Sequence, residues 1–74
     1  MMTTVPDYES NQYAFHVLRV GAALIRKRDN ASVYFQPGDC AAGAEEQAAH
    51  CFEAAEMFPG ERVRCFNRWA GEYF

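Results

Sequence analysis

The chain has 74 residues, a formal net charge of −3, and a composition that is 50% hydrophobic and 15% aromatic. This length leaves room for one small core, and this apolar content excludes a disordered tail as well as a fibrous protein. We therefore expect one domain over residues 1–74, with residues 1–6 as a flexible N-terminus.

Aromatic side chains and alanine supply most of the material for the core. The chain holds 6 Phe, 4 Tyr and 1 Trp, which together outnumber its Leu, Ile and Val residues. One buried aromatic side chain removes about 150–250 Å² from water, and a facing alanine leaves the space that it needs. The sequence therefore predicts a core of aromatic rings packed against alanines.

The N-terminal segment and the cysteines indicate the compartment. The first residues carry neither a basic cluster nor the apolar run of a signal peptide. The longest uncharged apolar stretch, residues 20–25, is far shorter than the roughly 20 residues that span a bilayer. Cys40, Cys51 and Cys65 are odd in number and lack the close spacing of a secreted disulfide framework. We expect a cytoplasmic protein with reduced thiols and no membrane segment.

The segment after Pro6 predicts a first helix. Asp7 or Ser10 is a suitable N-cap, and the helix is expected to end near Ala22 or Lys27. Apolar residues recur at i, i+3, i+4, i+7, i+8 and i+11, namely Ala14, Val17, Leu18, Gly21, Ala22 and Ile25. Neighbouring apolar residues widen this stripe to an arc of about 200°. Because so few other residues could cover it, we expect a homodimer.

A short strand follows the predicted first helix. Asp29-Asn30 favours a turn, residues 32–36 are β-branched and aromatic, and Pro37-Gly38 ends the run. We favour a hairpin in which residues 24–28 pair with this strand across Asp29-Asn30. The segment after Gly60, or the same strand in a second subunit, are the alternative partners.

Two further helices complete the expected fold. The first runs from the N-cap Asp39 to about Phe58, where Pro59-Gly60 stops it. One face of this helix is alanine-rich, and Glu45, Glu46, Glu53 and Glu56 occupy the opposite face. After Gly60, helical spacing favours a short third helix with an apolar face of Val63, Phe66, Trp69, Ala70 and Tyr73, although alternation over residues 62–66 would suit a strand. The predicted fold is a small, mainly helical α+β domain, and the alternative is an all-α arrangement of three helices.

Acidic and basic residues are segregated along the chain. Residues 29–61 contain seven acids and no Lys or Arg, whereas all seven basic residues lie outside this window. Two basic clusters result, Arg26, Lys27 and Arg28, and Arg62, Arg64 and Arg68. We therefore expect opposite charges on different parts of the surface, which would steer the chain toward a charged partner.

The sequence offers no constellation that favours an enzyme. His16, Cys40, His50, Cys51 and Cys65 are suitable zinc ligands by type, but they lack the close pair of a structural zinc site. Cys40 near a helix start has no residue to orient it, and the neighbouring Asp39 opposes a thiolate. The paired glutamates face solvent, where nothing raises a pKa for acid–base catalysis. We predict a protein without catalytic residues, cofactor or metal.

The sequence thus predicts a small interaction protein that binds or inhibits a protein partner. The predicted contact residues are the four glutamates Glu45, Glu46, Glu53 and Glu56 and four aromatic residues expected to be exposed, Tyr34, Trp69, Tyr73 and Phe74. The alternative is a nucleic-acid-associated regulator that uses the two basic clusters of residues 26–28 and 62–68.

Overall fold

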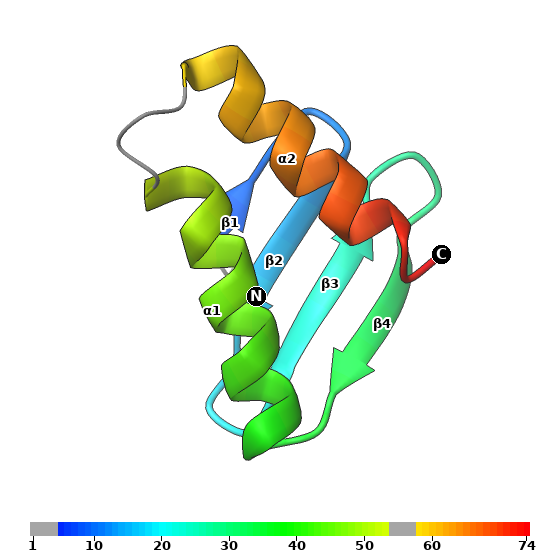
Figure 1. The fold of residues 1–74 in the computed structure, drawn as a ribbon. Helices are drawn as coiled ribbons and strands as arrows, with labels where there is room; N and C mark the ends of the chain where they lie inside the picture. Colours follow the sequence, from blue (N-terminus) through cyan, green and yellow to red (C-terminus); the bar gives the residue numbers. More distant parts are fainter. Residues whose placement is uncertain (1–4, 54–57) are drawn as a thin grey trace.

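The computed structural model describes residues 5–53 and 58–74, and it shows a four-stranded antiparallel sheet with two helices on one of its faces (Figure 1). In chain order the elements are β1 (Tyr8–Glu9), β2 (Tyr13–Val17), β3 (Ala22–Arg26), β4 (Ala31–Phe35), α1 (Asp39–Glu53) and α2 (Pro59–Gly71). The strands lie in sequence order, so that each pairs with the strand that precedes it. The chain is a small α+β domain, as predicted, and the all-α alternative is wrong.

The segment predicted as the first helix forms β2 and β3 instead. Ala14 and Phe15 are both buried although successive residues of a strand point to opposite faces of the sheet. The chain reverses between the strands, where the N–H of Leu18 donates to the carbonyl of Gly21 at 3.1 Å and Gly21 has a φ of 89°. The broad apolar arc therefore reflects two strands with apolar residues on both faces. The reason for expecting a homodimer is lost with this helix.

Two side chains that were predicted as helix N-caps, Asp7 and Ser10, instead accept hydrogen bonds from backbone N–H groups at the ends of strands. Ser10 Oγ accepts hydrogen bonds from the N–H groups two and three residues ahead, at 3.2 and 3.1 Å, and so closes the turn between β1 and β2. The Ser10 hydroxyl also donates to Asn67 Oδ1 of α2 at 2.5 Å. Asp7 Oδ2 accepts the N–H of Val17 at 2.7 Å. Ser10 has the local hydrogen-bonding pattern of a cap although no helix follows it, whereas Asp7 binds an N–H ten positions away in β2.

The predicted hairpin across Asp29-Asn30 is confirmed. Arg26 of β3 faces Ala31 of β4 in an antiparallel pair, and residues 27–30 form the turn. Asn30 has a φ of 58°, a conformation that asparagine tolerates better than most residues. Strand β3 begins two residues earlier than predicted, and the segment after Gly60, the alternative partner, is helical.

Both predicted C-terminal helices are present, with different boundaries. Asp39 lies in the first turn of α1 and does not precede it as an N-cap. The last part of the predicted helix, residues 54–57, lies outside the described residues, and Phe58 has extended backbone and caps α2. Pro59 occupies the start of α2, where its missing N–H costs nothing, so it opens this helix. The strand alternative for residues 62–66 is wrong.

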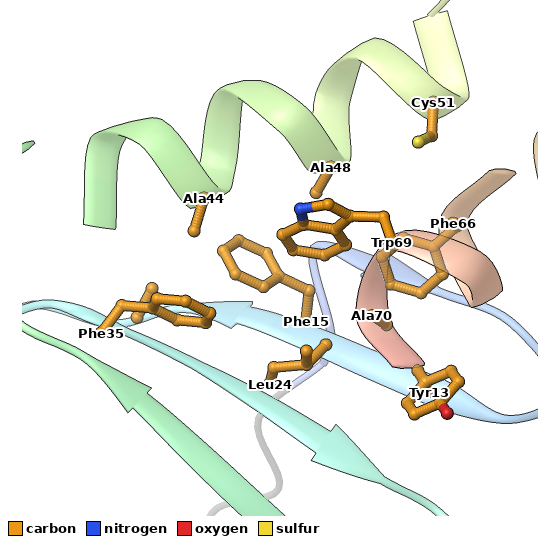
Figure 2. Close-up of a cluster of buried hydrophobic side chains, with 11 residues drawn as sticks. Tyr13, Phe15, Leu24, Phe35, Ala44, Ala48, Cys51, Phe66, Trp69 and Ala70 are labelled. Atoms are coloured by element: carbon orange, nitrogen blue, oxygen red, sulfur yellow. The ribbon is translucent and has the colours of Figure 1, made fainter. Parts of the chain in front are cut away.

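The core lies between the sheet and the helices and consists of aromatic rings and alanines, as predicted (Figure 2). Phe15 of β2 is at its centre, with ring centroids 5.8 Å from Trp69 of α2 and 6.1 Å from Phe35 of β4. Ala44 and Ala48 of α1 face these rings. Because alanine has a short side chain, α1 can approach the sheet closely enough to cover the rings.

Candidate functional site

The outward side of α1 carries the predicted acidic face. Ala44, Ala48 and Cys51 point into the core, which leaves Glu45, Glu46 and Glu53 exposed. Within residues 5–53 and 58–74, none of the ion pairs involves these three glutamates. Glu56, the fourth predicted member, lies outside the described residues. The three glutamates are called the α1 acidic face below.

The α1 acidic face extends toward the short strand β1. Burial raises the pKa of Tyr8 above its usual value of 10.0, and the negative charges of Glu53 and Glu45 add to this shift. Two of the three carboxylates are therefore close enough to act on a tyrosine of the neighbouring strand. The negative potential covers the side of the molecule formed by α1 and β1.

The four predicted aromatic residues do not join the α1 acidic face. Trp69 is 9% exposed and belongs to the core, so its predicted exposure is wrong. Tyr34 is 51% exposed, but it alternates with the buried Phe35 and therefore points away from the helices. Its hydroxyl donates to the carbonyl of Val20 at 2.8 Å, which ties β4 to the turn between β2 and β3.

The two C-terminal aromatic residues are exposed only in part. Tyr73 packs edge-on against Phe35 at 5.1 Å between ring centroids, and Phe74 stacks on Tyr13 at 5.8 Å. The guanidinium of Arg26 lies 4.8 Å from the centre of the Phe74 ring. These contacts give both side chains a structural role at the edge of the core.

The basic residues of the β3–β4 turn lie at the opposite side of the molecule from α1. In Figure 1, α1 is at the left and the turn of residues 27–30 is at the upper right. The turn and the neighbouring β1–β2 turn form a groove of about 440 Å³, which is lined by Asn11, Gln12, Tyr13, Arg26, Lys27 and Arg28. The sequence did not indicate that amide side chains and a tyrosine would join this basic cluster.

Two of the three basic side chains in this turn are already paired. Arg26 binds the Asp29 carboxylate through two hydrogen bonds, at 3.0 and 2.7 Å, and Lys27 binds Glu9 at 2.6 Å. The hydrogen bond from Arg26, and after it the N–H of Ala31, lower the pKa of Asp29 from 3.8 to about 2. Among the described residues, no ion pair involves Arg28, which leaves its charge available to a ligand.

The α2 arginines form no common site with the β3–β4 turn. Arg64 lies 3.9 Å from Glu61 one helical turn away, and Arg62 is half-buried. Arg64 and Arg68 line a groove along α2, whereas the groove at the turn contains no residue of α2. The two predicted basic clusters therefore present separate surfaces.

A groove between α1 and α2 is the feature that the sequence did not indicate. It has a volume of about 520 Å³, and its lining includes Gln47, His50, Cys51, Cys65, Arg68 and Trp69. The two thiols meet here, with their sulfur atoms 2.7 Å apart. Within the described chain the buried indole N–H of Trp69 has no hydrogen-bond acceptor. Cys51 lies in the last turn of α1 and Cys65 in the middle of α2, so the packing of α1 against α2 brings the two thiols together.

Comparison with protein-family models, curated proteins and solved structures gives no match for this chain. In the part of the chain that the structure describes, no helix is long and apolar enough to cross a membrane. Across residues 5–53 and 58–74, no three His, Cys, Asp or Glu side chains gather as metal ligands would.

Proposed function

We propose that the chain is a small, non-enzymatic cytoplasmic interaction protein, and that it binds a basic segment of a protein partner through the α1 acidic face. The observation that carries this proposal is the exposure of Glu45, Glu46 and Glu53 without an ion pair inside the described chain. A partner that supplies Lys or Arg would pair these carboxylates.

The rigidity of α1 supports this proposal. Its inner side is fixed in the core through Ala44, Ala48 and Cys51, so the outward carboxylates are displayed on a fixed element. A preformed surface loses little conformational entropy on binding. The basic turn at the other side of the molecule adds a charge asymmetry that orients the encounter.

Affinity capture from the native host tests this proposal. The bait is the full chain, and the test variant is the double substitution Glu45→Lys and Glu53→Lys. The matched control is Glu61→Lys and Glu72→Lys, which changes the net charge equally at two exposed positions of the C-terminal region. We expect a protein that is retained by the wild type and the control, lost with the test variant, and released by salt.

Capture of the same proteins by the wild type and the test variant would show that the α1 acidic face is only solvated surface. If the captured protein is the chain itself, the partner is a second copy. This outcome would support the homodimer expected from the sequence, although the original reason for it has been lost.

The groove at the β3–β4 turn favours a second candidate function, binding of nucleic acid. Arg28, which forms no ion pair with another described residue, supplies a cation, and Asn11 and Gln12 supply amide groups beside it. Phosphate contacts and base contacts need these group types.

Fluorescence anisotropy with short single-stranded and double-stranded DNA and RNA tests this second function at two salt concentrations. Arg28→Glu should weaken binding, whereas Arg19→Glu, an equal charge change in the β2–β3 turn, should leave it nearly unchanged. The absence of binding at low salt would remove this candidate.

A further inference from the structure

Two thiols from the two helices meet in the groove between α1 and α2. Cys51 Sγ and Cys65 Sγ lie 2.7 Å apart, and both cysteines are free. A disulfide bond has a length of about 2.05 Å, so the two sulfur atoms are within reach of a bond without a rearrangement of the helices. Cys40 is at the other end of α1, about 16 Å from Cys51 along the helix axis at 1.5 Å per residue. The fold therefore selects one pair among the three cysteines.

The two thiols differ in their access to solvent. Cys51 is 3% exposed, whereas Cys65 is half-buried and lines both the interhelical groove and the groove along α2. Burial, and after it the hydrogen bond with Cys65, raise the pKa of Cys51 to about 12. Of these two thiols, a dissolved reagent therefore reaches Cys65 first. Cys51 remains protonated until Cys65 has reacted, and it then attacks the modified Cys65 sulfur.

We propose that Cys51 and Cys65 are a reversible modification site, at which exchange with a small-molecule disulfide such as oxidised glutathione forms an intramolecular disulfide. The Cys65 thiolate attacks one sulfur of the small disulfide, forms a mixed disulfide and releases one thiolate. Cys51 then loses its proton, attacks the Cys65 sulfur and releases the second thiolate. The two protein sulfurs are oxidised, the two sulfurs of the small molecule are reduced, and both thiol protons pass to the leaving thiolates.

The disulfide would link α1 covalently to α2. Cys51 lies in the last turn of α1 and Cys65 in the middle of α2, 14 positions further along the chain. The link would hold the two helices in the arrangement that shapes their groove. Because such exchange is reversible, the site suits a compartment in which thiols are normally reduced.

Equilibration of the full chain in glutathione redox buffers tests this proposal. Free thiols are trapped by alkylation, and mass spectrometry with peptide mapping identifies the linkage. We expect an intramolecular disulfide between Cys51 and Cys65, whereas the exposed Cys40 stays outside this disulfide, either free or as a mixed disulfide with glutathione. The Cys40→Ser variant should form the same disulfide, whereas Cys51→Ser and Cys65→Ser should form no intramolecular disulfide.

The same equilibration in concentrated urea, where the chain is unfolded, shows whether the fold favours the disulfide between Cys51 and Cys65. We expect the exchange constant to be on the order of 100-fold larger in the folded chain, as the loop-closure entropy of a segment of this length implies. Equal constants in buffer and urea would overturn the proposal. Random pairing that includes Cys40, or three free thiols in oxidised glutathione, would overturn it as well.

Discussion

The turn between β2 and β3 allows a direct test of the fold, because alanine at Gly21 has opposite effects in a hairpin and in a helix. In the structure Gly21 has a φ of 89°, and a Cβ atom built there would lie 2.5 Å from the Phe35 carbonyl oxygen and 2.5 Å from the Tyr34 hydroxyl oxygen. In a continuous helix over this region, the same substitution would stabilise the chain by about 1 kcal/mol.

Gly21→Ala should lower the free energy of unfolding through two effects, backbone strain and steric overlap. Alanine substitutions at Gly38 and Gly43 allow these two effects to be measured separately. A positive φ costs alanine about 1–2 kcal/mol, and relief of the overlap with the backbone carbonyl adds about 1–3 kcal/mol. Gly38 has a φ of 100° with open space around it, so Gly38→Ala carries only the first cost. Gly43 lies in α1 with nothing within 4 Å of its added Cβ, so Gly43→Ala should stabilise the chain by about 0.5–1 kcal/mol.

Urea unfolding, followed by far-UV circular dichroism, measures all three variants. We expect the unfolding midpoint to fall in the order Gly43→Ala, wild type, Gly38→Ala, Gly21→Ala, with an unchanged denaturant slope. A Gly21→Ala variant as stable as the wild type, or more stable, would refute the assignment of β2, the turn and β3.

Three further predictions concern the core, the β3–β4 turn and the thiols. Phe15→Ala removes the ring at the centre of the core and should cost about 3–5 kcal/mol in urea unfolding, a large part of the stability of so small a domain. The pKa of Asp29 is about 2 beside Arg26, below its usual 3.8, so the stabilisation that it gives is complete above about pH 4 and is lost as the pH falls through about 2. The stability difference between the wild type and Asp29→Asn should therefore shrink over this range, and a constant difference would contradict the ion pair. Under native conditions iodoacetamide should modify Cys40 first and Cys51 only after unfolding, as peptide mass spectrometry over time would show.

Local sequence signals predicted the chain from the β3–β4 turn onward and failed in the segment before it. The alanine-rich and glutamate-rich faces of α1 follow from one helical period, and Asp29-Asn30 marks its turn by its own backbone preferences. The apolar residues of β2 and β3 match the spacing of a helical stripe by coincidence. Because both faces of these strands carry apolar residues, apolar residues also occur at the positions i, i+3, i+4 and i+7 that a helix would require. Gly21 and the run of aromatic and β-branched residues in β2 were the available signs of a turn and a strand.

The exposure of a residue could be predicted from the sequence only where it depends on a single helix or strand. The exposure of Glu45, Glu46 and Glu53 follows from their place on α1 and was predicted correctly. Trp69 was expected to be exposed, but the ring of Phe15 from a distant strand covers it. The interhelical groove and its pair of thiols depend on how α1 packs against α2, which no period within one helix describes.

The intrinsic fluorescence of the single tryptophan, Trp69, can report on the interhelical groove because of its position. The Trp69 ring packs on Phe15 and Phe66 and also lines the interhelical groove, so its emission senses the polarity of both. A partner docked on Glu45 and Glu53, which do not line the groove, would leave this emission unchanged, whereas any molecule that enters the groove would shift its wavelength. One spectrum can therefore tell occupants of the two surfaces apart without a label.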